Sequence, residues 1–347
     1  MIVNIVSKTT YTLSDVVKVS SYELNQDSDY NGKTEIVLHR KPKAEEEDFI
    51  LLHDGSTSFA GVISTIENDH GFNSYRLTVI EMVRLFDQMI VLDNESLLAT
   101  GIEDFIADQI KRNFISSADT MLNIPYLTVT AKTHTPVAAA VDAENGIYNL
   151  CTYIGNALTT YGIFIGFAFT SESLNIVIEN RQQTSFDIDT GIADITAVDE
   201  VYSVKALTKL TVLWQKDENS AVTTRHFFLK TDRTITENMN DPDRAAGTSN
   251  VIFTAAATEE EMKQEAKNQF TSNSYQHKIE FDVIRSSRLI PEAALYVGHK
   301  CRVKTKNGIK DSMISGINRS NGSSTISVTL GQLKITLIDK ITKGINR

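Results

Sequence analysis

The sequence predicts a mainly β protein with α+β insertions: two similar small β-barrels, one α/β domain and a smaller insertion with one helix. Three observations predict this class. Short apolar runs with period-two alternation, separated by turn clusters, occupy both ends of the chain. The period becomes helical near residue 100 and again near residue 258. Finally, a β-hairpin close to the N-terminus returns, without gaps, close to the C-terminus.

Composition supports several modules of ordinary globular character. The 347 residues are 41% hydrophobic and 22% charged, enough for two or three units that each bury a core. We expect the first β-barrel over residues 1–95 and the α/β domain over 96–198. We expect the second β-barrel over 199–232 and 285–347, interrupted by the small insertion at 233–284.

The first 95 residues contain a series of short strands. Polar clusters at 25–32 and 68–71 and the Asp54-Gly55 pair predict the turns between them. The expected strands cover residues 1–6, 16–24, 34–39, 49–52, 59–66 and 75–80. Short strands at even spacing favour a small barrel or sandwich.

The next hundred residues predict two helices and three strands. Thr100 and Glu103 form a capping-box pattern ahead of a helix over 101–115, whose apolar residues share one face. A strand at 126–131 precedes a second helix at 146–161, and Gly162 suits a left-handed C-cap. Strands at 163–169 and 174–179 follow. Cys151 lies on the apolar helix face and is expected in the core rather than as a nucleophile.

From residue 199 the chain returns to strands. A hairpin is expected over 209–215 and 222–229, where packing explains Trp214 better than ligand stacking. Asp241 and Asp243 hint at a Ca²⁺ loop, but the EF-hand positions are not filled, which favours a surface loop. Thr258 and Glu261 predict a capping box that opens a helix to about residue 270. His277, in the strand expected at 275–283, is expected as a satisfied core residue.

The repeat is found by aligning residues 49–66 with 300–317. Both segments read as strand, turn and strand, and both end in Ile-Ser-x-Ile before an Asn-rich turn and another alternating strand. We interpret this pattern as a structural duplication that gives each barrel of a ring the same hairpin. The residues expected to mark it are Gly61, Ile63, Ile66, Ile314, Gly316 and Ile317.

Charge is distributed unevenly along the chain. The net charge of −10 argues against a DNA-gripping surface, whereas the segment from Lys300 onward carries ten Lys or Arg against Asp311 and Asp339. Two interpretations stay open: lysines on the exposed faces of strands, or a basic end that docks on an acidic neighbour.

A family resemblance rests on four stretches in order along the chain. They are Phe59-Ala-Gly61-Val-Ile63 followed by Leu85-Phe86-Asp87; the helical segment 102–114; the helix, glycine and hairpin of 147–178; and Val297-Gly298-His-Lys-Cys-Arg-Val303 followed by Asp311-Ser-Met-Ile314-Ser-Gly316. In this order they resemble the baseplate hub, or tail-associated, proteins of tailed bacteriophages, prophages and phage-tail-like bacteriocins.

The resemblance implies a homotrimer whose two barrels per chain continue the tail channel as a pseudo-hexameric ring. It implies a distal tail protein or tail tube ring and the tape-measure protein as partners, with DNA passing through the lumen without sequence-specific binding. It places the chain in the virion tail, assembled in the host cytoplasm, where two unpaired cysteines are expected. Lytic and receptor-binding modules follow the second barrel in longer members and are not expected here.

Catalytic, cofactor and metal motifs are not found in the sequence. Its seven histidines show no ligand spacing, and its longest apolar run, 163–169, is too short to span a membrane. Asp187 and Asp189 are a carboxylate pair of the kind glycosidases use, but such pairs are frequent among 44 acidic residues. We therefore expect no enzyme and no cofactor. The alternatives are a carbohydrate-binding adhesin module and another ring protein of the tail, such as the distal tail or tube protein.

Overall fold

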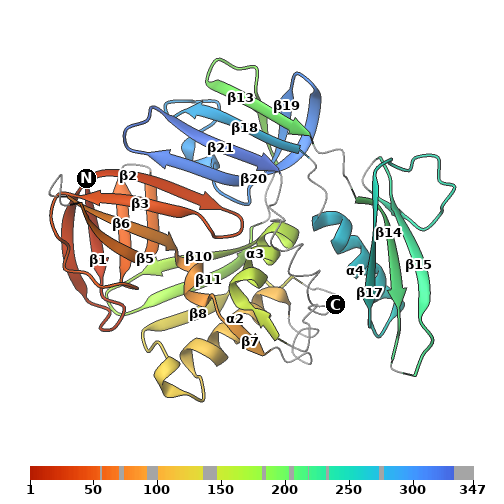
Figure 1. The fold of residues 1–347 in the computed structure, drawn as a ribbon, viewed down its shortest axis with the longest axis horizontal. Coiled ribbons are helices and arrows are strands. Elements are labelled where there is room, and N and C mark those ends of the chain that lie inside the picture. Colours follow the sequence, from red (N-terminus) through yellow and green to blue (C-terminus); the bar gives the residue numbers. More distant parts are fainter. Residues whose placement is uncertain are drawn as a thin grey trace.

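The computed structural model describes residues 1–54, 57–69, 74–91, 101–135, 147–181, 185–202, 207–217, 219–231, 234–272 and 277–331. Four hydrophobic cores are present in these residues. They correspond to two β-barrels, an α/β domain and a small unit set apart at one side of the molecule (Figure 1).

Six strands close into the first β-barrel. They are β1 (Ile2–Val6), β2 (Leu13–Asp27), β3 (Lys33–Leu38), β4 (Phe49–Asp54), β5 (Thr57–Asp69) and β6 (Ser74–Glu81). The order is β1-β4-β5-β6-β3-β2, and β1 closes the ring by pairing with both β4 and β2. Alternate side chains such as Ile5, Ile36 and Leu77 point inward and are fully buried. The predicted small barrel is confirmed.

The second β-barrel repeats this strand order. Its strands are β12 (Phe186–Asp189), β13 (Ile195–Tyr202), β18 (His277–Ile284), β19 (Lys300–Thr305), β20 (Gly308–Ser320) and β21 (Thr325–Gly331). The order is β12-β19-β20-β21-β18-β13, but β12 runs parallel to β19, whereas β1 runs antiparallel to β4. Among the described residues no pairing joins β12 to β13, so this second barrel is open where β1 and β2 close the first. Strand β2 pairs with β20, so the two barrels share one twelve-stranded sheet.

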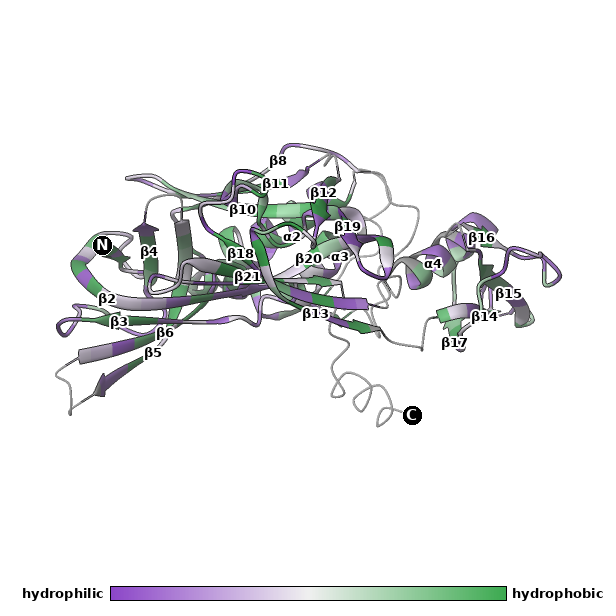
Figure 2. Ribbon diagram, turned by 90° about the horizontal axis from the view of Figure 1, so that it is seen from above, coloured by the Kyte–Doolittle hydropathy of each residue, from purple (hydrophilic) through white to green (hydrophobic). Residues whose placement is uncertain are grey.

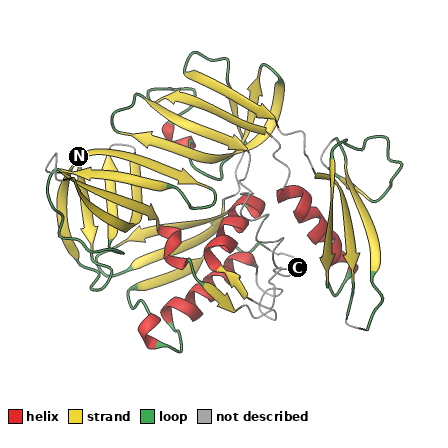
Figure 3. Ribbon diagram, viewed as in Figure 1, coloured by secondary structure: helices red, strands yellow, loops and turns green. Residues whose placement is uncertain are grey.

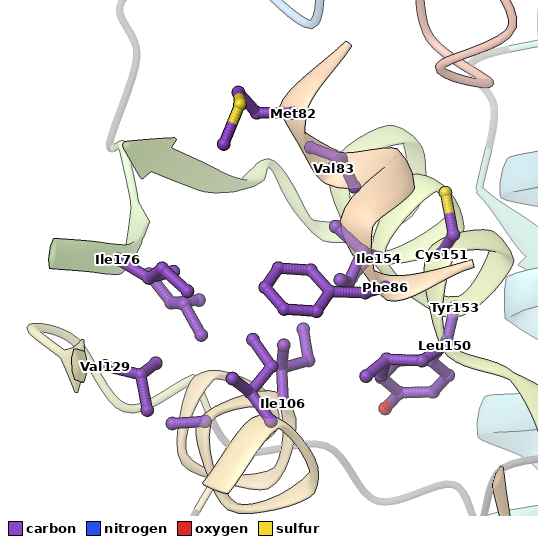
Figure 4. Packing of buried hydrophobic residues seen from close by; sticks show 14 of the residues in the cluster. Met82, Val83, Phe86, Ile106, Val129, Leu150, Cys151, Tyr153, Ile154 and Ile176 are labelled. Atoms are coloured by element: carbon purple, nitrogen blue, oxygen red, sulfur yellow. The ribbon is translucent and has the colours of Figure 1, made fainter. Parts of the chain in front are cut away.

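The α/β domain lies against both barrels. Its elements are η1 (Met82–Phe86), β7 (Met89–Val91), α2 (Ile102–Ile110), η2 (Lys111–Ile115), η3 (Thr120–Leu122), β8 (Leu127–Ala131), β9 (Ile147–Asn149), α3 (Leu150–Tyr161), β10 (Ile163–Phe169) and β11 (Leu174–Asn180). Figure 3 shows its helices gathered beside the sheet of order β10-β11-β8. Phe86 lies at the centre of the core, among Ile106, Ile154 and Ile176 (Figure 4).

The small unit lies at the end of the molecule opposite the first barrel (Figure 2). It comprises β14 (Leu207–Trp214), β15 (Thr223–Leu229), β16 (Ile235–Thr236), β17 (Thr248–Thr254) and α4 (Glu259–Ser272). Met262, Ala266 and Phe270 of α4 are buried against the sheet, as their spacing predicts. Trp214 packs on this core and donates its indole N–H to the Ala256 carbonyl oxygen at 2.7 Å, so the packing interpretation of Trp214 is confirmed.

Strand pairing differs from the expected boundaries of the second barrel. The hairpin β14–β15 belongs to the small unit, because its apolar residues, Val212 among them, face α4 rather than a barrel. Strands β12 and β13, expected in the α/β domain, and β18, expected in the insertion, instead carry core residues of the second barrel, such as Ile188 and Phe281. An alternating pattern identifies a strand but does not say which core it enters.

Helix ends agree with the sequence in two of three cases. Gly162 caps α3 in the left-handed conformation, with φ of 74°. Thr258 Oγ1 accepts from the Glu261 N–H, and Glu261 accepts from the Thr258 N–H, each at 3.2 Å, which confirms that capping box. The capping box predicted at Thr100 and Glu103 is wrong for Glu103. Gly101 is the N-cap of α2, and the buried Glu103 carboxylate accepts hydrogen bonds from Thr133 and Thr135 instead. Thr100 lies outside the described residues.

Two smaller expectations also change. The helix expected from residue 146 begins at Leu150, because residues 147–149 form β9 and pair with β7. Hairpin β4–β5 forms as expected, and Gly55 lies outside the described residues. No helix in the described part of the chain has the length and apolar character that crossing a membrane requires.

Candidate functional site

The two barrels contain the same three-stranded unit. In the gap-free alignment, β4 and β5 have the same bounds as β19 and β20, position for position, and β6 begins where β21 begins. Asp54 pairs with Thr57 at the first hairpin, and Thr305 pairs with Gly308 at the second. The repeated sequence therefore folds into a repeated structure.

Register is conserved down to an irregularity in the middle of the long strand. In β5 a bulge separates Ile63 from Thr65, and in β20 a bulge separates Ile314 from Gly316. The partners on the third strand are equivalent too: Ile63 pairs with Val79, and Ile314 pairs with Leu330. A bulge bends its strand, so both long strands change direction at the same point.

The residues predicted to mark the repeated hairpin have two roles: some pack in a barrel core, and one lies at the contact between the barrels. Ile63, Ile314 and Ile317 are buried in the barrel cores, and Ile66 is partly buried against the first one. Gly61 is paired between Ile50 and Glu81, inside the first barrel. Gly316 pairs with Asp27 of β2, so it lies at the contact between the barrels. Gly61 and Gly316 do not occupy equivalent positions in the alignment.

That contact is an antiparallel strand pair formed by polar segments. It runs from the pair of Glu23 with Ser320 to that of Asp27 with Gly316. The Asn318 side-chain amide donates to Asn25 Oδ1 at 2.6 Å and to Glu23 Oε1 at 2.8 Å. Asn321 accepts the Tyr22 N–H at 3.0 Å. We call this β2–β20 contact the barrel junction.

Sequence reasoning missed the barrel junction. It placed turns at 25–32 and at 318–322, whereas β2 continues to Asp27 and β20 to Ser320. Asn and Asp are typical of turns because their side chains bond to local backbone. Here Asn25 and Asn318 lie within strands and bond to each other across the junction. The available signal was that both polar clusters directly continue an alternating strand.

A buried ion pair holds the second barrel at the junction. Arg319 Nε lies 3.3 Å from Glu292 Oε1, and the two side chains are 11% and 12% exposed. Arg319 also donates to Gln26 Oε1 at 3.0 Å and to the Leu295 carbonyl oxygen at 2.6 Å. Burial lowers the pKa of Arg319, partly offset by Glu292. Glu292 in turn accepts from Thr57 Oγ1 of the first barrel at 2.9 Å, so one carboxylate contacts groups from both barrels.

A second carboxylate beside the junction has an unusual pKa. Burial raises the pKa of Glu81 to about 8, and the nearby Asp27 carboxylate adds to the rise. The Asp27 N–H donates to Glu81 Oε1 at 3.2 Å, so Glu81 supports the end of β2 that forms the junction. Burial and the charge of Glu81 raise the pKa of Tyr30 as well.

The α/β domain fixes the outer faces of both barrels. On the first, Tyr11 stacks on Tyr126 with ring centroids 4.3 Å apart and donates its hydroxyl to the Ser173 carbonyl oxygen at 2.6 Å. On the second, Phe164 meets the edge of Tyr296 at 5.7 Å, and the Arg181 guanidinium lies over both rings. The domain therefore contacts both barrels.

Side chains that could support chemistry are engaged in other interactions. Arg302 pairs with Asp187 and Lys304 with Asp189, at 2.8 and 2.9 Å, and each pairing lowers the pKa of its aspartate. A general acid needs the opposite shift. Burial raises the pKa of Cys151 to about 11, which makes this thiol a poor nucleophile.

Potential metal ligands and the core histidine are also engaged in structural interactions. No group of three His, Cys, Asp or Glu residues that could hold a metal ion occurs among the described residues. Asp241 and Asp243 lie near Lys230 Nζ, at 3.9 and 3.8 Å. His277 Nε2 is hydrogen-bonded to Ser312 Oγ at 2.9 Å in the second barrel, so the interpretation as a satisfied core histidine is confirmed.

The basic C-terminal segment is partly explained by strand alternation. Exposed and buried residues alternate along β19, with Lys300, Arg302 and Lys304 on the exposed face. Two of these cations pair with β12 of the same chain. Four basic residues of this segment follow β21: Lys334, Lys340, Lys343 and Arg347. They lie outside the described residues.

These features define a class: two register-matched β-barrels in one chain, joined by strand pairing and supported by an α/β domain. No protein-family model and no curated protein sequence matches the chain. Solved structures do match it. A prophage tail protein from Listeria monocytogenes superposes with a TM-score of 0.58 at 11% identity, covering 100% of this chain and 99% of that one.

Two further structures extend the comparison. The tail protein from Neisseria meningitidis has a TM-score of 0.57 at 10% identity, covering 96% of each chain. A chain of the phage P2 baseplate, in its activated conformation with Ca, has a TM-score of 0.51 at 11% identity, covering 95% of this chain and 98% of that one. The chain has the fold of phage tail and baseplate proteins, and the predicted resemblance is confirmed for the fold.

Proposed function

We propose that the chain is the structural hub of a phage or prophage tail tip. Three copies form a pseudo-hexameric ring that continues or closes the tail channel and joins the tail to the distal host-recognition apparatus. The observation that carries this proposal is the repeat of one hairpin register, bulge included, in two barrels of a single chain. Two quasi-equivalent barrels per chain let three chains present six similar units around one axis.

Such a ring joins parts of different symmetry. Its six barrels suit a six-fold distal tail protein or tail tube ring, while the three chains suit three-fold parts beyond it. The tape-measure protein and DNA would pass through or stop at its lumen. The net charge of −10 favours a channel that repels phosphate, so DNA slides without sequence-specific binding.

The proposal gives the chain no enzymatic role. Its best carboxylate pair, Asp187 and Asp189, is ion-paired on the surface, and both cysteines are buried. The similar tail and baseplate proteins are structural components, which agrees with this assignment.

The alternatives fit fewer observations. An adhesin that binds carbohydrate needs exposed aromatic side chains for stacking, and within the described residues Phe253 is the large aromatic residue with high exposure. A distal tail or tube protein carries one barrel per chain, whereas this chain repeats the barrel unit.

Mass measurement in solution tests the proposal. We expect a particle near three times 38.6 kDa, with a central hole in negative-stain images. A protein that stays monomeric at every concentration and binds polysaccharide would favour the adhesin instead.

A further inference from the structure

The turn that follows β2 contacts three parts of the molecule. We call residues 27–31, which end β2 and lead to β3, the junction loop. The Asp27 carboxylate accepts two backbone N–H groups within this loop, each at 3.0 Å. The Ser28 N–H donates to the Ser315 carbonyl oxygen of β20 at 3.0 Å. Tyr30 is 7% exposed and packs in the core of the α/β domain, so a loop of the first barrel also contacts the second barrel and that domain.

The junction loop covers one face of helix α3. A Cβ at Gly155 would lie 3.3 Å from the Ser28 carbonyl oxygen and 3.8 Å from Tyr30 Cε2, so the loop lies directly on the helix. Cys151 lies one turn earlier on the same face and is 2% exposed. It belongs to the same core as Tyr30, and the two side chains interact electrostatically. The closed loop therefore helps to shield the Cys151 thiol.

The Glu81 carboxylate anchors the base of the junction loop. Its Oε1 accepts the Asp27 N–H at 3.2 Å, so it lies against the residue whose own carboxylate organises the loop. Burial and then the charge of Asp27 raise the pKa of Glu81 to about 8, because a low dielectric and a second carboxylate both oppose ionisation. The closed loop therefore favours a protonated Glu81.

Other polar groups lie on the elements around Glu81. They are Gln26 of β2, Tyr30 of the junction loop, Cys151 of α3, Arg84 of η1 and Lys33 of β3. The Gln26 side chain hydrogen-bonds to Glu81 and lowers its pKa, against the larger effect of burial. Of the two cations, Arg84 pairs with Asp87 at 2.6 Å and Lys33 is exposed to solvent. A negative charge on Glu81 is therefore unfavourable while the loop is closed.

We propose that the junction loop is a latch operated by a proton on Glu81. With the proton bound, the loop stays closed over β20 and α3. Without it, the carboxylates of Glu81 and Asp27 repel each other, and the loop leaves its place, which frees the end of β2 and uncovers Cys151. The opening is local, because the cores of the two barrels lie on other residues. The latch adds a regulatory device to the proposed function and does not depend on the number of chains in the particle.

Linkage gives the direction of the pH effect. The pKa of Glu81 is about 8 in the closed loop against an ordinary 4.5, so the closed loop binds this proton more tightly than the open one. Opening is therefore least favourable below pH 4.5, becomes more favourable by at most about tenfold per pH unit above it, and levels off above about pH 8.

The test is alkylation of the full chain with iodoacetamide from about pH 6 to about pH 9. Cys151 and Cys301 are both buried, so mass spectrometry of their two peptides compares local opening with exposure of the second barrel. We expect labelling of Cys151, relative to Cys301, to rise up to about pH 8 in the natural chain and to stay flat in Glu81→Gln. Glu35→Gln, which removes an exposed carboxylate, should behave like the natural chain.

The charge of Glu81 cannot produce this result without opening. Burial is the largest cause of the raised pKa of Cys151, and the charge of Glu81 adds to it, which by itself slows alkylation. Faster labelling at high pH therefore reports exposure of the thiol.

Three outcomes overturn the latch: no labelling of Cys151 at any pH, a rise that persists in Glu81→Gln, or a parallel rise at Cys301. If Glu81→Gln fails to fold, hydrogen exchange on the natural chain takes its place. After division by the intrinsic rates, the amides of Asp27 and Ser28 should lose protection as pH rises, relative to those of β3. Equal changes in both places overturn the inference.

Discussion

Glu47 and Gly298 occupy equivalent positions ahead of the two repeated hairpins, and both have positive φ, 72° and 89°. Each donates its backbone N–H to the residue before the bulge: Glu47 to the Ile63 carbonyl at 2.8 Å, and Gly298 to the Ile314 carbonyl at 2.8 Å. The duplicated unit therefore includes the loop that enters it, although the two sequences differ there completely.

Gly298→Ala tests why this position is glycine in one barrel. A Cβ at Gly298 would lie 2.6 Å from Leu158 Cδ1 of the α/β domain. The left-handed backbone costs alanine a further penalty of about 1–2 kcal/mol. We expect a clear loss in the free energy of unfolding, measured by urea titration. Glu47→Ala is the matched control, because a side chain already exists at that φ. Equal effects of the two substitutions would contradict the explanation.

Most strands and helices were predictable because their signals are local. Alternation in β3, the apolar face of α4 and the capping box of Thr258 with Glu261 each depend on residues close in sequence. The duplicated hairpin was also predictable, since a two-residue connection fixes the register of its strands.

The assignment of strands to domains and the barrel junction were not predictable in this way. Strand β18 reads as an ordinary alternating strand, and only its packing against β21 and β13 places it in the second barrel. Arg319 and Glu292 are distant in sequence from Gln26 and Thr57, so their contacts exist only once both barrels have formed. The polar residues at the ends of β2 and β20 therefore predicted turns instead of the barrel junction.

Gly61→Val should destabilise the first barrel. An added Cβ would lie 2.5 Å from Val79 Cγ1 and 2.6 Å from the Ile80 carbonyl oxygen, so neighbouring strands must move. Overpacking of this kind costs about 1–3 kcal/mol. Thermal unfolding of the variant, compared with Gly322→Val, measures it. Nothing lies within 4 Å of a Cβ at Gly322, so a loss as large in that control would argue against the packing explanation.

Stability should depend on pH through Glu81. Its pKa is about 8 in the folded chain against an ordinary value of 4.5, so the folded chain binds this proton more tightly than the unfolded chain. The resulting stabilisation is complete below about pH 4.5 and is lost as pH rises to about 8. The glutamine of Glu81→Gln cannot ionise. The free energy of unfolding of this variant, relative to that of the natural chain, should therefore rise between about pH 5 and about pH 8.

The measurement is the urea midpoint of both proteins across this range. Asp27 and Tyr30 face Glu81 and are retained in the variant, so the difference between the curves reports the substituted group. Glu35→Gln removes an exposed carboxylate on the neighbouring β3 and serves as the control. A constant difference between the Glu81→Gln and natural curves at all pH values would exclude the raised pKa.

Arg319→Met should be the most damaging of these substitutions, because it removes the cation that lies 3.3 Å from the nearly buried Glu292 carboxylate. Breaking one side of a buried pair costs about 3–5 kcal/mol, whereas replacing both partners is often close to neutral. We therefore expect Arg319→Met/Glu292→Gln to recover much of the loss in urea unfolding. Arg76→Met/Glu35→Gln removes an exposed pair at 3.4 Å and should cost about 1 kcal/mol at most. If Arg319→Met costs no more than this control pair, the ion pair does not hold the barrel junction together.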